Sequence, residues 1–134
     1  MGEEQVLSWT DALAKTLDCE NPWFKKYVEF LEALIDRSAG RYPVSHGVEL
    51  GPTDLHALVR GHSGSIIDLM DEPDKSAELL MHLGNVFAQF FKESWQRLPL
   101  YHGGYFDAQY QLWAPGPIIR MQEDATALLS PDLY

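Results

Sequence analysis

Cysteine is nearly absent from this sequence of 134 residues, because Cys19 is the only one. A single cysteine cannot form an internal disulfide, and it cannot build a zinc site from several thiolates. The five histidines show neither an H-x-x-x-H nor an H-E-x-x-H spacing. We therefore expect no bound metal and no cofactor. The start of the chain has neither the basic nor the apolar part of a signal peptide, which predicts a cytoplasmic protein.

Basic residues are also scarce, with 10 Lys and Arg against 20 Asp and Glu and a formal net charge of -10. Such a charge repels the phosphates of nucleic acids and the surfaces of anionic membranes. No apolar run approaches the roughly 20 residues that a membrane-spanning helix needs. The sequence thus predicts neither nucleic acid nor a membrane as partner.

Apolar residues, in contrast, are plentiful: 46% of the chain is hydrophobic and 12% is aromatic. This amount can form a core in a chain of this length, which predicts a single domain over residues 1–134. Capping residues and helical spacing of apolar residues predict its helices. They are Ser8–Leu17 within an N-terminal helical segment 1–20, a helix from Pro22 with Asn21 as cap and Gly40 as its stop, about Thr53–Arg60 followed by a further turn through Ile66, Ile67, Leu69 and Met70, and Pro73–Arg97.

Two short apolar stretches, Val44–Leu50 and Ile118–Glu123, are typical of core strands. The long helix Pro73–Arg97 lies between them in sequence, and a strand, crossover helix and strand favour a parallel pair. Residues 100–117 are rich in aromatics, glycine and proline, which predicts an irregular hairpin. Along the long helix we expect a buried stripe at Ala77, Leu80, Met81, Gly84, Phe87, Phe91 and Trp95.

Three stretches resemble the uroporphyrinogen decarboxylase superfamily, which also includes cobalamin-dependent and coenzyme M methyltransferases. They are Leu50–Gly61 with its Gly-Pro corner before a helix, Asp68–Lys75 leading into the long helix, and Gln122–Pro131 with its polar pair after a strand. The resemblance extends over about residues 21–134. It implies an α/β fold that is a middle section of a (β/α)₈ TIM barrel, helix-rich with a few mostly parallel strands.

The resemblance also has departures that bear on activity. The arginine-rich segment that binds substrate carboxylates in the decarboxylases has no counterpart here, nor has the zinc site of the methyltransferases. The family's tyrosine after the Gly-Pro corner falls near Leu58, and its serine after the second strand falls at Asp124. The resemblance thus implies a partial carboxy-lyase-like or methyltransferase-like protein that is inactive alone. Alternatives are a stand-alone oligomerising or small-molecule-binding module, or an enzyme assembled from two or more chains.

Several residues are candidates for a site. Glu123 and Asp124 stand where a barrel strand meets its active-site loop, so we predict them as catalytic acids. An acidic turn that caps the next helix is the alternative.

For substrate binding the candidates are His102 and Tyr105 around a Gly-Gly pair, His46 on the first strand, and Arg120. A structural loop and ordinary core histidines are the alternatives here, and Arg120 is expected to pair with an acid such as Glu123 or Asp124.

A few parallel strands taken from a barrel would leave unpaired backbone at both edges of their sheet. We therefore expect a homodimer or a larger closed oligomer that buries more than about 1,000 Å² in total.

Overall fold

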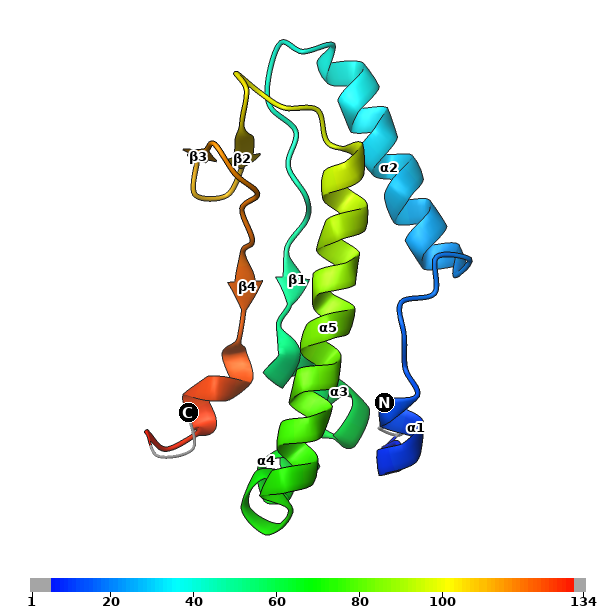
Figure 1. Ribbon diagram of the computed structural model, residues 1–134, viewed down its shortest axis with the longest axis vertical. Coiled ribbons are helices and arrows are strands. Elements are labelled where there is room, and N and C mark those ends of the chain that lie inside the picture. The colour runs from blue at the N-terminus through cyan, green and yellow to red at the C-terminus, as the bar shows by residue number, and fades with distance from the viewer. Residues whose placement is uncertain (1–5, 132–134) are drawn as a thin grey trace. The chain divides into compact units, whose positions relative to one another are not determined.

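The computed structural model describes residues 6–131, which form a helix-rich α/β protein with four short strands (Figure 1). The chain divides into two compact units. The first unit holds residues 6–16, 49–88 and 121–131, and the second unit holds residues 17–48 and 89–120. Helix α5 (Pro73–Arg97) runs without a break from one unit into the other, with the bounds that the sequence predicts.

The helices of the first unit begin in different ways. In α1 (Trp9–Leu13) the side chain of Ser8 accepts a hydrogen bond from the Asp11 amide at 3.1 Å, but the helix is shorter than the predicted Ser8–Leu17. Helix α3 (Pro52–Arg60) has its proline at the first position, and α4 (His62–Asp71) follows after a single residue. That residue is Gly61, whose φ of 81° lies in the left-handed region that glycine adopts most readily.

The core of the first unit contains Ala12, Leu79 and Leu83, with further apolar side chains of α1 and α3 packed against them. The buried stripe of α5 runs through Ser76, Leu79, Leu83, Phe87, Phe91 and Ser94. The prediction was right for Phe87 and Phe91 and wrong for Ala77, which is exposed, and for Met81, which is 71% exposed. It chose positions that lie about one residue further along the helix, because apolar residues adjoin the stripe on both sides.

The first unit contains one parallel pair of strands, which joins residues 49–50 to residues 121–122. Strand β1 (Glu49–Leu50) pairs with β4 (Met121–Gln122), with Glu49 opposite Met121 and Leu50 opposite Gln122. This confirms the predicted parallel pairing, and the two arrows lie side by side in Figure 1. The ladder is shorter than predicted, and among residues 6–131 no third strand joins it.

The second unit consists of α2 (Pro22–Ser38), the last part of α5 and a hairpin. The Asn21 side chain caps α2 by accepting from the Trp23 amide at 2.9 Å, as predicted. The helix ends at Ser38, where Ala39 takes up a left-handed conformation with a φ of 46°. Gly40, which the sequence predicts as the stop of this helix, follows Ala39 directly and has a left-handed φ of 71°.

The hairpin pairs β2 (Tyr105–Asp107) with β3 (Leu112–Ala114) in antiparallel orientation, which confirms the irregular hairpin predicted over residues 100–117. Aromatic rings fill the space between α2 and the C-terminal part of α5. The rings of Tyr27 and Phe90 lie 4.9 Å apart, and the Tyr27 hydroxyl is 2.8 Å from that of Ser94.

Two glycines of the first unit differ in the space around them, which leads to a first prediction. A methyl group on Gly84 would lie 3.7 Å from Pro52, which is an ordinary contact. Gly84→Ala should therefore raise the free energy of unfolding by about 1 kcal/mol, the helix propensity that alanine gains over glycine. A methyl group on Gly51 would instead overlap the Glu123 carboxylate and the Met121 side chain.

Gly51→Ala is the same substitution at a site with no room for the added methyl group. It should therefore lower the free energy of unfolding by about 1–3 kcal/mol. Urea denaturation of both variants measures the two changes. Equal effects of the same sign would contradict the packing described around these two glycines.

Candidate functional sites

The first candidate site is the strand-end corner, which we define as Thr53 and Asp54 at the start of α3 and Glu123 and Asp124 after β4. The Glu123 carboxylate accepts a hydrogen bond from the Thr53 amide at 3.0 Å and a second one from the Thr53 hydroxyl. The N-cap of α3 is Gly51, which has no side chain to offer. Glu123 therefore caps α3 from the end of the neighbouring strand.

Asp54 makes the reciprocal contact. Its carboxylate, only 9% exposed, accepts from the amides of Asp124 at 3.2 Å and Ala125 at 2.8 Å. These amides begin the 3₁₀-helix η1 (Asp124–Leu128). Each of the two carboxylates thus caps the helix that follows the other strand.

Glu123 and Asp124 therefore lie together at the carboxyl end of the parallel pair, but their contacts differ. The carboxylate of Asp124 is exposed and accepts from the Gln122 side chain at 2.7 Å. The sequence analysis missed Asp54, although an acid in the first turn after Gly-Pro is a signal of helix capping.

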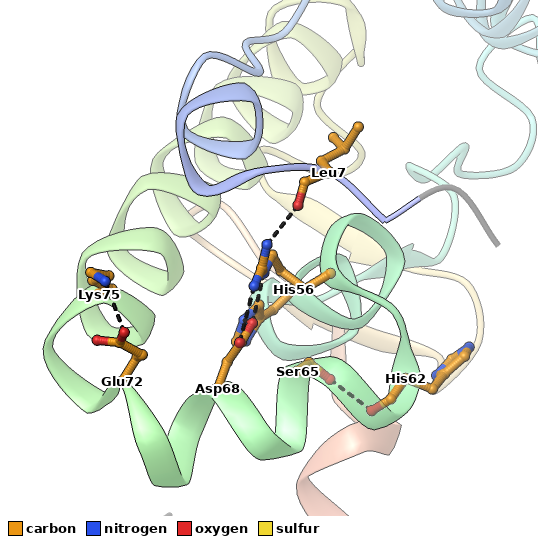
Figure 2. Close-up of polar contacts among 8 residues, drawn as sticks. Leu7, His56, His62, Ser65, Asp68, Glu72 and Lys75 are labelled. Carbon is orange, nitrogen blue, oxygen red and sulfur yellow. Dashed lines mark hydrogen bonds and ion pairs between the residues drawn. The ribbon is translucent and has the colours of Figure 1, made fainter.

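A second cluster of polar side chains connects α3 with α4 (Figure 2). The Arg60 guanidinium donates to both oxygens of Asp68, from Nε at 2.6 Å and from Nη2 at 3.0 Å. Its Nη1 donates to the Leu7 carbonyl at 2.6 Å, and the guanidinium carbon lies 4.3 Å from the centre of the Trp9 ring. Arg60 therefore ties three segments of the first unit together.

His56 belongs to the same cluster and is 1% exposed. Its Nε2 lies 3.7 Å from an oxygen of Asp68, which is longer than a hydrogen bond. Burial lowers the pKa of His56, although the Asp68 charge opposes that change. The hydrogen bonds from Arg60 hold the pKa of Asp68 below its ordinary value, and the same contact raises the pKa of Arg60. Arg60 and Asp68 are thus occupied with each other and form a structural link between α3 and α4, whereas the buried Nε2 of His56 has no hydrogen-bond partner among the described residues.

The third candidate is a pocket in the second unit, which we call the aromatic pocket. Its volume is about 410 Å³, and its wall joins the end of α2 to the turn after α5. His102 takes part in that wall with a left-handed φ of 50°, and its ring lies 4.3 Å from that of Tyr101. The lining residues are Ser38, Gly40, Arg41, Tyr42, Pro43, Val44, Pro99, Leu100, Tyr101 and His102.

A much smaller cavity, with room for about one water molecule, shares Val44, Pro99 and Tyr101 with this pocket. His46 and Tyr105 line it. The His46 ring is buried, with Nδ1 2.7 Å from the Gly47 carbonyl oxygen and Nε2 3.1 Å from that of Ile118.

Three of the four residues predicted to bind a substrate therefore line these two neighbouring cavities: His102, His46 and Tyr105. Arg120 lines neither of them. Its guanidinium lies 5.7 Å from the centre of the Tyr110 ring, in place of the acidic partner that was predicted. Arg41 and Tyr42 were missed, and their only signal is a position directly after a helix end.

The part of the chain that the structure describes contains no group of three or more His, Cys, Asp or Glu residues arranged to hold a metal ion. Each helix within residues 6–131 is too short or too polar to cross a bilayer. The chain matches no protein-family model, and neither a curated protein nor a solved structure is similar to it.

The buried imidazole of His56 leads to a prediction on pH. Unfolded His56 takes up a proton near its ordinary pKa of about 6.5, whereas the folded ring with its lowered pKa does so only in more acidic solution. The unfolded state therefore binds more protons, and the free energy of unfolding should fall as the pH drops below about 6.5. Urea denaturation at about pH 7.5 and about pH 5.5 measures this loss.

The loss should be smaller in His56→Gln, which removes the titrating group, and unchanged in the control His62→Gln, which alters an exposed histidine. NMR titration of the His56 ring in the unaltered protein gives an independent measurement. A ring that takes up its proton above its ordinary pKa would contradict the prediction.

Proposed function

We propose that this chain is a partial member of the uroporphyrinogen decarboxylase superfamily that does not catalyse a reaction by itself. The order of its elements supports the proposal: a strand, a Gly-Pro corner, helix α3, the crossover helix α5 and a second parallel strand with a polar pair. Residues 6–131 contain one such pair, against the eight strands of a barrel. A cytoplasmic location is part of this proposal.

The observation that carries the lack of activity is the use of the carboxylates at the strand-end corner. A general acid or base must reach the proton that it transfers. Glu123 instead accepts two hydrogen bonds from Thr53, and Asp54 accepts two from the start of η1. Of the acids at the corner, Asp124 alone presents an exposed carboxylate, and that carboxylate accepts a hydrogen bond from the Gln122 side chain.

The purified protein should accordingly release no carbon dioxide from uroporphyrinogen, as measured by chromatography of the porphyrin products. Asp124→Asn serves as the matched variant because it replaces the exposed carboxylate. Turnover by the unaltered protein that this variant abolishes would contradict the proposal and would establish an active corner.

The aromatic pocket favours a second candidate function, that of a small-molecule-binding module. Its volume of about 410 Å³ is within the range of roughly 300–1,000 Å³ that is typical of ligand sites. It combines apolar walls with a few polar side chains, as such sites do. Binding of a small molecule is compatible with the loss of turnover at the other site.

We also propose that the chain forms a homodimer. Strands β1 and β4 form a two-stranded parallel sheet, an arrangement that proteins ordinarily cover on both faces. In the first unit Leu50, Met81 and Met121 are exposed. In the second unit Trp23 and Phe30, seven residues apart and thus on one face of α2, are 83% and 64% exposed. Such apolar surfaces are typical of contacts with another chain.

Sedimentation velocity at low micromolar concentration should therefore give a species of twice the chain mass of 15.2 kDa. Dilution should dissociate it reversibly. A well-folded monomer that persists over the whole concentration range would contradict the homodimer.

A further inference from the structure

We propose that the aromatic pocket of the second unit binds a small organic anion with one flat ring, of the class of monocyclic aromatic carboxylates. This inference rests on the small-molecule binding proposed above and adds the charge and shape of the ligand. It concerns a site that does not include the strand-end corner.

The first argument is the charge of the pocket. Acids outnumber bases by two to one in this chain, yet no Asp or Glu is among the lining residues of the aromatic pocket or of the smaller cavity. Arg41 and His102 line the former and His46 lines the latter. Arg41 is the permanently charged residue of this lining, and its positive charge attracts an anion and repels a cation.

The second argument is the fixed position of the Arg41 guanidinium. Its Nε donates to the Ser38 carbonyl at 3.3 Å, and its Nη2 donates to the Arg37 carbonyl at 3.1 Å. These contacts use one pair of adjacent N–H donors of the guanidinium, the fork between Nε and Nη2, and they hold the group against the end of α2. The other fork, between Nη1 and Nη2, has the geometry that accepts a carboxylate through two parallel hydrogen bonds.

The third argument is shape. Tyr42 and Tyr101 give the wall two flat faces, and Pro43, Pro99 and Leu100 add apolar surface. Aromatic rings pack well against such faces. Ala39 and His102, next to and within the wall, both adopt left-handed backbone conformations that are unfavourable for residues other than glycine. Such conformations concentrate at ligand sites.

The test uses three probes of nearly the same size and different charge: benzoate, benzamide and benzamidine. Each is titrated into the full chain labelled with ¹⁵N, and the amide shifts are followed by NMR. Benzoate should shift the signals of Arg41, Tyr42, Tyr101 and His102 in a saturable manner. Its Kd should be at least tenfold lower than that of neutral benzamide, and cationic benzamidine should not saturate.

Arg41→Gln should remove the preference for benzoate over benzamide, and Arg41→Lys, which retains the charge without the fork, should retain part of it. The matched control is Arg37→Gln, because Arg37 is also at the end of α2 but its side chain does not line the pocket. The NMR spectrum of each free variant verifies that it is folded.

The outcomes separate the two proposals. Equal saturable binding of benzoate and benzamide at this pocket would overturn the anion preference and leave the binding function intact. Shifts that saturate at a different place on the chain, or a preference that survives Arg41→Gln, would also overturn the inference. No saturable binding of any of the three probes would overturn both the inference and the small-molecule-binding function.

Discussion

The first unit depends on two reciprocal capping contacts, which the carboxylates of Asp54 and Glu123 make. A helix that starts directly after a strand leaves its first amides without partners, and here two helices start in this way at one place. Glu123 provides the acceptor for α3, and Asp54 provides it for η1. The same contacts hold β1 and β4 in register, since each carboxylate comes from the end of one strand and binds after the other. A two-residue ladder alone would give little stability.

Much of the fold could be predicted because the signals are local. Asn21 and Pro22 specify the start of α2, and Pro73 and Arg97 bound α5, through capping chemistry that needs no knowledge of the rest of the chain. The parallel pairing followed from topology, since a helix between two strands leaves few alternatives. The length of the strands could not be predicted. Of the predicted strands Val44–Leu50 and Ile118–Glu123, only residues 49–50 and 121–122 pair, because the hydrophobic pattern does not show where the backbone ladder stops.

The candidate sites were harder to predict, because their contacts depend on how the chain folds and not on local signals. Glu123 was identified from its position after a strand, but its hydrogen bonds to Thr53 depend on a residue 70 positions away. His56 gave no signal, because a histidine in a short helix becomes part of a buried cluster only when Asp68 folds back beside it. Arg41 gave no signal either, since its position is set by carbonyls at the end of a helix rather than by a motif.

Gly61 determines whether Arg60 can reach Asp68 at all. Had α3 and α4 formed one straight helix, residues eight positions apart would be separated by about 12 Å along its axis, too far for a guanidinium to bind both oxygens of a carboxylate. The left-handed backbone at Gly61 turns the chain. Arg60 at the end of α3 can therefore contact Asp68 in α4. The two hydrogen bonds between Arg60 and Asp68 thus depend on Gly61, the one residue between the helices, which has no side chain.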